Sequence, residues 1–398
     1  SSQTRGTGQK RKPDKLRITF LLKDLASNGG GNRVIGQHAQ YLIDAGHTVT
    51  LIGLPEPRLK LRSRLRLLRN GRLRASIEPY RARVEKISDH FKSLVGYLEV
   101  LPDHRPIKES DIPASDAIIA TWWETAEWMG NFTGQNGNCI HFAQDYEVFP
   151  YLPQERVLSV YDRKFPTIAV SGWVKKQLEE NHSNPHVTVV NNTVDTDFFA
   201  PKSRDYASRF TVGTLLAPSP RKRSFFALDV LRQIHNLGID IGFVAFGQDK
   251  HSFEIPEWVK FFENPKQTQI PEIFSSCDVW LFTSESEGFG LPILEAMACG
   301  TPVLATEAGA AIDLIDGMNG KILSYDAKEF VREVIKLHES SDKLHAFSAS
   351  ARRTAKQKST ISSSKEFENA LLQMCGSITT RSFLSESPES SSTRRSSK

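Results

Sequence analysis

Apolar residues occur in short runs along this chain, separated by polar or glycine-rich segments. The run LRITFLL at 16–22 has the length of a strand, and SNGGGNR at 27–33 forms a turn. A helical spacing of apolar residues then continues to residue 45, before HTVTLIG at 47–53. A strand, a loop, a helix and a second strand open a parallel, doubly wound sheet. Helical patterns also separate several of the further strands that we predict, at 116–121, 138–143, 167–171 and 187–192.

The same pattern starts again after the polar stretch at 201–206. We predict strands at 210–216, 240–247, 278–284 and 302–306, and helices at 221–238 and 291–299. A chain of 398 residues exceeds one ordinary core. We therefore expect two Rossmann-like α/β domains, over 14–203 and 204–376, with a last helix that can return to the first domain.

Composition supports a globular interior and distinguishes the two ends. The hydrophobic fraction is 39% and the charged fraction 24%. Residues 1–13 and 377–398 lack regularly spaced apolar residues, so we expect disordered tails there. No stretch reaches the roughly 18–20 apolar residues of a membrane span, and none resembles a signal peptide. The four cysteines are far apart in sequence, which favours buried thiols in a reducing compartment over a zinc site. We expect a cytoplasmic protein.

The net charge of +5 is unevenly spread. Residues 58–77 hold eight Lys or Arg and no acid, and Leu61, Leu65 and Leu68 are spaced as one helix face. A basic amphipathic helix at 58–74 can lie on an anionic membrane surface, each basic group contributing about 1 kcal/mol. A solvated surface segment is the equally open alternative. No nucleic-acid-binding motif is present, so no such partner is expected.

The segment SESEGFGLPILEAMACGTPVLAT at 284–306 carries the strongest chemical signal. Glu287 lies in a glycine loop, and Glu295 follows eight residues later on a helix. Unpaired backbone N–H groups at the helix start, on Phe289, Gly290 and Leu291, can bind a phosphate or a sugar hydroxyl. A carboxylate such as that of Glu295 can hold both hydroxyls of a ribose. These residues alone leave an ordinary strand–loop–helix equally open.

This segment resembles the Glu-x7-Glu signature of retaining GT-B glycosyltransferases of family four. The resemblance extends to GGGNRVIGQHAQYLIDAGHTVTLI (29–52), AVSGWVKKQL (169–178), VVNNTVDTDFFAP (189–201) and PEIFSSCDVWLFTSESEGFG (271–290). It implies a GT-B fold, two Rossmann-like domains facing a cleft, and a nucleotide-sugar donor bound without a metal or other cofactor. It also places the backbone of Gly29, Gly30 and Gly288 near the donor, with Glu287 on the sugar or diphosphate.

The chain departs from this family after Gly213, where Thr214 replaces the expected Arg. Lys222 matches the family's Lys, and we expect Arg221 to stand in for the missing Arg. Their charge would stabilise the leaving diphosphate, with an arginine binding two oxygens at once. A solvated basic helix start is the alternative, although the helix dipole disfavours it unless an anion is near.

A second departure concerns the acceptor side, where many relatives carry a His and this chain has Gln144 followed by Asp145. The stretch FAQDYE resembles FVQDFE of a subgroup that builds rhamnose-containing and related surface polysaccharides. We expect Asp145 to orient the acceptor or to take its proton. Trp122 and Trp123 would stack on sugar faces or belong to the core, two alternatives that the sequence leaves open.

We therefore predict a metal-independent hexosyltransferase that moves a sugar from a dTDP-, GDP- or UDP-sugar to a saccharide or a lipid-linked oligosaccharide. Asp195 and Asp197 resemble a metal pair, but they lie in a stretch similar to a turn of the family, so no metal role is expected. The rivals are a sugar-nucleotide epimerase on the same fold and a non-catalytic polysaccharide-assembly module. A nicotinamide-dependent oxidoreductase is disfavoured because the spaced GxGxxG is missing.

Overall fold

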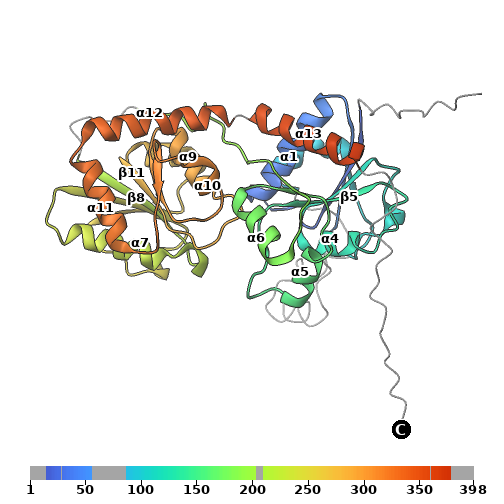
Figure 1. Cartoon of the computed structure of the whole chain (residues 1–398), viewed down its shortest axis with the longest axis horizontal. Coiled ribbons are helices and arrows are strands. Elements are labelled where there is room, and N and C mark those ends of the chain that lie inside the picture. The colour runs from blue at the N-terminus through green and yellow to red at the C-terminus, as the bar shows by residue number, and fades with distance from the viewer. Residues whose placement is uncertain (1–14, 28, 56–86, 203–208, 359, 378–398) are drawn as a thin grey trace, which may run out of the picture.

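The computed structural model describes residues 15–27, 29–55, 87–202, 209–358 and 360–377. Two lobes lie side by side along the long axis of the molecule, each built around one parallel sheet (Figure 1). The first sheet has the order β3-β2-β1-β4-β5-β6-β7. Its strands are β1 (Arg17–Leu22), β2 (Thr48–Gly53), β3 (Leu98–Val100), β4 (Ala117–Ala120), β5 (Asn138–Ala143), β6 (Thr167–Ala169) and β7 (Val187–Val189). Its helices are α1 (Gly30–Asp44), α4 (Trp123–Met129), α5 (Gln154–Tyr161) and α6 (Gly172–His182), with 3-10 turns η2 (Asp89–Tyr97) and η3 (Glu109–Asp111).

The second sheet has the order β10-β9-β8-β11-β12-β13. Its strands are β8 (Phe210–Leu216), β9 (Ile241–Gly247), β10 (Val259–Glu263), β11 (Val279–Phe282), β12 (Val303–Ala305) and β13 (Gly320–Ile322). The helices that follow in the chain are α7 (Ser224–His235), α8 (Ile270–Ser275), α9 (Leu291–Ala298), α10 (Ala311–Leu314), α11 (Ala327–His338), α12 (Ser341–Gln357) and α13 (Thr360–Ser377). Short 3-10 turns complete the lobe: η4 (Pro220–Lys222), η5 (Lys250–Ser252) and η6 (Gln267–Gln269).

The central strands are buried along their whole length. Every residue of β4 and β11 is buried, as expected for parallel strands with helices on both faces. The predicted strands are confirmed in both sheets, and the fold class with them. Three strands that the apolar pattern did not predict, β3, β10 and β13, lie at sheet edges, where strands are short and partly exposed.

The last two helices connect the lobes. Helix α12 packs along α9, and α13 then crosses to lie against α1 of the first lobe (Figure 1). The ring of Phe367 on α13 stacks on His38, with 4.3 Å between the ring centroids, and contacts Phe142 edge-on. Glu368 on the same helix accepts a hydrogen bond from His47 at 2.8 Å. The first lobe therefore contains the end of the described chain.

The loops after β1, β4, β5, β8 and β11 carry residues of the candidate site. In parallel α/β sheets, ligands bind beyond the carboxyl ends of the strands. The basic segment predicted as one helix over 221–238 is divided: η4 carries Arg221 and Lys222, Arg223 takes a left-handed conformation (φ 51°), and α7 begins at Ser224. The two cations therefore lie in a separate turn in front of the helix.

Candidate functional site

The glycine loop between β11 and α9 forms the centre of the site. Gly290 caps α9 with φ 79°, a left-handed conformation that favours glycine. Leu291 and Pro292 then begin the helix, where a proline is tolerated. The backbone N–H groups of Phe289 and Gly290 donate no hydrogen bond to any residue that the structure describes. Unpaired N–H groups at a helix start can bind an anion, as the sequence predicts.

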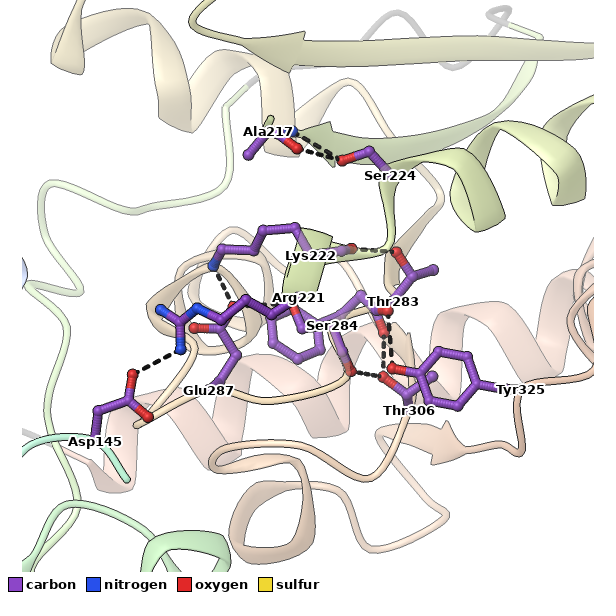
Figure 2. Close-up of polar contacts among 11 residues, drawn as sticks. Asp145, Ala217, Arg221, Lys222, Ser224, Thr283, Ser284, Glu287, Thr306 and Tyr325 are labelled. Carbon is purple, nitrogen blue, oxygen red and sulfur yellow. Dashed lines mark hydrogen bonds and ion pairs between the residues drawn. The ribbon is translucent and has the colours of Figure 1, made fainter. Parts of the chain in front are cut away.

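Lys222 and Glu287 form an ion pair beside this loop. The ammonium group of Lys222 contacts Oε1 of Glu287, and the hydroxyl of Ser284 donates to the same oxygen at 2.8 Å. Glu287 is buried, with an exposed fraction of 6%. Figure 2 shows Lys222 and Arg221 extending from one turn toward Glu287 and Asp145. The turn is fixed to the loop because the backbone N–H of Glu285 donates to the carbonyl of Arg221 at 2.7 Å.

Arg221 joins the two lobes. Its guanidinium donates to Oδ2 of Asp145 at 2.9 Å and lies over the ring of Phe149, 4.6 Å from the centroid. Burial raises the pKa of Asp145 to about 6, while Arg221 opposes this shift and Glu287 adds to it. Asp145 thus lies on the first lobe in direct contact with the basic turn of the second lobe.

The two glycine-rich loops meet across the cleft. A Cβ added to Gly288 would stand 1.9 Å from the carbonyl oxygen of Gln144, and one added to Gly30 would stand 3.0 Å from Leu291. The hydroxyl of Ser171 donates to the carbonyl of Gly288 at 2.5 Å. Gly29 and Gly30 are exposed at the start of α1, facing this contact. The structure thus brings together the glycine turn of the first lobe, Gln144 and the loop at 288–291.

Glu295 pairs with a residue that the sequence analysis missed. It is 8% exposed on α9, and its Oε1 lies 3.5 Å from the guanidinium of Arg33 on α1. Burial raises the pKa of Glu295, and Arg33 opposes the shift. Arg33 follows the glycines in GGGNR, so its place in the first turn of α1 was the signal available in the sequence.

A cavity of about 830 Å³ opens in the first lobe, next to Arg221. Its wall includes Trp122, Gln144, Asp145 and the loop after β1. The size suits a small saccharide, since ligand pockets commonly measure roughly 300–1,000 Å³. Glu287 and Glu295 lie outside this wall, whereas Gly29 and Arg221 are part of it.

Two predicted site residues lie in the interior instead. Gly213 is buried within β8, where a Cβ would come within 2.5 Å of the ring of Trp280 and of Cys277, and its neighbour Thr214 is 1% exposed. Gly213 is therefore packed inside the sheet, and the buried hydroxyl of Thr214 donates to the carbonyl of Leu281 at 3.2 Å. Trp123 is 3% exposed in the core of the first lobe and does not line the cavity. It therefore belongs to the core rather than to the acceptor site.

The remaining predictions concern metals and membranes. Asp195 accepts hydrogen bonds from the backbone N–H groups of Asp197 and Phe198, both at 3.0 Å, and so stabilises a turn. Within the described ranges, no three His, Cys, Asp or Glu side chains gather as a metal site would require. No described helix is both long and apolar enough to span a bilayer. The basic segment at 58–74 and the predicted tails at 1–13 and 377–398 lie outside the described residues, except for Ser377, with which α13 ends.

Comparison with protein families and with curated proteins finds glycosyltransferases in both cases. Residues 202–354 match the family model described as glycosyl transferases group 1. The chain is 30% identical over 181 residues to an uncharacterized glycosyltransferase of Methanocaldococcus jannaschii, which is 42% of this chain and 49% of that protein. It is 32% identical over 99 residues to D-inositol 3-phosphate glycosyltransferase 2 of Catenulispora acidiphila, which is 24% of this chain and 23% of that protein. The chain thus spans about half, or less, of these two relatives' lengths.

Solved structures resemble both lobes together. HepE of Anabaena in complex with UDP superimposes with a TM-score of 0.66 at 18% identity, covering 89% of this chain and 99% of HepE. Sucrose-phosphate synthase of Thermosynechococcus elongatus gives a TM-score of 0.63 at 15% identity, covering 91% and 100% of the two chains. At such identities the likeness concerns the fold. The chain therefore has the two-domain GT-B fold, and its residues 202–354 are similar to group 1 glycosyl transferases.

Proposed function

We propose that this chain transfers a sugar from a nucleoside-diphosphate sugar to a hydroxyl of a saccharide acceptor, with retention of the anomeric configuration. One observation carries the proposal: a group 1 glycosyltransferase domain presents two cations and free helix-start N–H groups at the same cleft. A diphosphate leaving group needs such charge, because negative charge develops on it as its bond to the sugar breaks.

On the donor side, Lys222 and Arg221 would neutralise the diphosphate. Both now pair with carboxylates, Lys222 with Glu287 and Arg221 with Asp145, and phosphate oxygens would compete for them. Glu287 and the N–H groups of Phe289–Leu291 would position the sugar. Glu295 would accept hydrogen bonds from the ribose hydroxyls, with Arg33 holding its carboxylate.

On the acceptor side, the cavity beside Arg221 would hold the saccharide, with Trp122 and Gln144 in its wall. The acceptor oxygen would bond to the anomeric carbon as the bond from that carbon to the diphosphate breaks. The acceptor proton would pass to the departing phosphate on the same face, or to Asp145. The approach of the two lobes would keep water out and limit hydrolysis of the donor. The proposed reaction uses no metal ion.

The biological setting follows from the resemblance. We propose a role in surface-polysaccharide synthesis at the cytoplasmic face of a membrane, with a free or lipid-linked saccharide acceptor and peripheral contact through 58–74. UDP is the first donor nucleotide to test, since the HepE structures hold UDP, UDP and glucose, or UDP-glucose. dTDP-rhamnose and GDP-sugars are the alternatives that the rhamnose-related subgroup suggests.

The test is stabilisation of the folded protein by donors, because a ligand that binds only the folded state raises the melting temperature. UDP-, dTDP- and GDP-sugars are compared for the wild type and for Lys222→Ala. Arg223→Ala is the matched control: it lies one residue further on, and its guanidinium faces Glu285 at the surface. We expect one donor class to stabilise the wild type and the control but not Lys222→Ala. No stabilisation by any donor would contradict the proposal.

Product analysis separates the proposed reaction from its rivals. The donor that stabilises the protein is incubated with a saccharide panel, and NMR of the anomeric proton reports whether the configuration is retained. Incubation without acceptor should give only slow hydrolysis. An isomerised nucleotide sugar would identify an epimerase, while binding without turnover by any acceptor would indicate a non-catalytic module.

A further inference from the structure

Glu147 is a buried acid in the wall of the proposed acceptor cavity. The transfer reaction described above assigns no role to this residue. It lies two residues beyond Asp145 and lines the cavity with an exposed fraction of only 1%. Its Oε2 accepts a hydrogen bond of 2.7 Å from the backbone N–H of Trp123, at the start of α4. No described residue donates to Oε1. One oxygen of this carboxyl is therefore held by the fold, and the other is left without a protein partner.

Burial determines the charge of this carboxyl. It raises the pKa of Glu147 well above its usual range, and nearby Asp145 adds to the rise, while the N–H of Trp123 opposes it. Burial therefore favours the protonated form of the carboxyl, whose O–H can donate a hydrogen bond. A sugar hydroxyl that enters the cavity would supply a hydrogen-bond partner for this group.

The cations of the cavity wall are already paired. Lys23 lies 3.1 Å from a carboxylate oxygen of Glu124, and Arg221 lies 2.9 Å from Asp145. Nδ1 of His104 is 2.8 Å from the carbonyl of Pro55. Among the described residues of the wall, each of these side chains thus has a carboxylate or carbonyl partner for which an anionic acceptor would have to compete. Binding of a donor diphosphate to Arg221 would leave the Asp145 carboxylate without its ion-pair partner. The repulsion between this carboxylate and an anionic acceptor would then increase.

Aromatic rings complete the wall. Trp122 is half-buried, and Tyr151 is 78% exposed at the rim, with its ring stacked on Phe149 at 5.4 Å. Such rings present apolar faces on which the C–H face of an uncharged sugar can pack. A large tyrosine exposed at the rim of the cavity suits ligand contact rather than support of the core.

We propose that Glu147 is an acceptor-binding residue that hydrogen-bonds a hydroxyl of the sugar, and that this cavity selects uncharged saccharides over uronic acids and sugar phosphates. The inference deepens the proposed transfer reaction and rests on it. The acceptor would thus be an uncharged saccharide, a property that the donor-side residues do not determine.

The experiment measures binding of sugars to the full chain saturated with UDP. Saturation-transfer NMR compares methyl glycosides of glucose, galactose, mannose and rhamnose with glucuronate, galacturonate and glucose 6-phosphate at equal concentration. We expect at least one methyl glycoside to bind, and each charged sugar to bind at least tenfold more weakly. Equal binding of the charged sugars overturns the proposal, as does the absence of glycoside binding to the UDP-loaded protein.

Variants then test the role of Glu147. Glu147→Ala and Glu147→Met should each weaken glycoside binding about tenfold, which corresponds to the loss of one hydrogen bond. The methionine preserves the side-chain volume, so this variant is expected to fold. Glu147→Gln should stay within about threefold of the wild type, because its amide can bond to Trp123 and to the sugar. Glu155→Ala, at an exposed position on α5, is the control.

A third change tests the rim of the cavity. Tyr151→Ala removes an exposed ring on which folding does not depend, and should weaken glycoside binding without altering UDP affinity. Unchanged glycoside affinity in Glu147→Ala or Glu147→Met overturns the role of Glu147, and in Tyr151→Ala it overturns the placement of the acceptor. UDP affinity should be the same in all variants. Failure of the wild type to bind any nucleotide would instead contradict the proposed function.

Discussion

The contact between Gly288 and Gln144 leaves no room for a side chain. A Cβ on Gly288 would stand 1.9 Å from the carbonyl oxygen of Gln144 and 2.9 Å from its carbonyl carbon, whereas ordinary contact begins at 3.4 Å. Both obstructing atoms belong to the backbone and cannot rotate away. In Gly288→Ala the two loops must therefore separate by about 1.5 Å.

That separation acts on the bonds that hold the lobes together at the site. The hydrogen bond from Ser171 to the carbonyl of Gly288 and the ion pair between Arg221 and Asp145 cross the same gap, at 2.5 and 2.9 Å. A misplacement of about 1 Å can cost about 100-fold in rate. We expect kcat to fall by about 100-fold, while UDP affinity changes less than about threefold, because the donor residues lie mainly on the second lobe.

Steady-state kinetics and calorimetric titration with UDP measure the two effects separately. Gly96→Ala is the control, because a Cβ at Gly96 meets nothing within 4 Å. Wild-type kcat in Gly288→Ala would refute the reasoning, since it would show that the working enzyme does not bring Gly288 against Gln144. A large loss of UDP affinity with kcat preserved would equally contradict it.

Three further predictions concern the pH dependence, the ribose contact and the last helix. Because the pKa of Asp145 is raised to about 6, activity that needs its ionised form should rise through that pH, and Asp145→Asn should remove the rise. The folded state also binds this proton more tightly than the unfolded state, so the wild type should lose stability relative to Asp145→Asn as the pH rises from about 4 to 6, which pH-dependent denaturation measures. Glu295→Ala should weaken UDP binding by roughly 10- to 100-fold and abolish any preference for UDP over its 2′-deoxy analogue in titrations, since a bond to a charged group contributes about 1.5–3 kcal/mol; a preserved preference would contradict the ribose role. Phe367→Ala should lower the free energy of unfolding by about 3–5 kcal/mol in denaturant titrations, whereas Ile361→Ala, at a 71% exposed position of the same helix, should change it by less than about 0.5 kcal/mol.

Much of the fold follows from the sequence by local rules. Continuous apolar runs such as those of β1, β5 and β8 are long enough to identify buried strands without knowledge of their neighbours. Strands β3 and β13 were missed because a charged residue interrupts each of them, so neither contains a continuous apolar run. The helix predicted from residue 221 began too early, because the left-handed Arg223 that divides it is not a residue type that signals a break.

Part of the site was also predictable. The spacing of Glu287 and Glu295 around a glycine loop indicated a ligand site, because a helix start after glycines exposes N–H groups whatever the rest of the chain does. The family resemblance suggested donor contact for Gly213, and the sequence left open whether Trp123 stacks on a sugar or belongs to the core. Both occur in motifs that suggest ligand contact, and only the packing of Trp280 and of the first-lobe core shows that they are interior.

The sequence by itself determined two parallel-sheet domains and the residue types of a candidate donor site. Buried strands and helices each require a characteristic spacing of apolar residues, which can be read along the chain. The tertiary structure alone decided the partners: Arg221 with Asp145, Arg33 with Glu295, and Gly288 against Gln144. It also placed Glu147 in the wall of the cavity. Such contacts join loops that are distant in sequence, and no periodicity within either loop records which carboxylate or carbonyl the folded chain will bring near it.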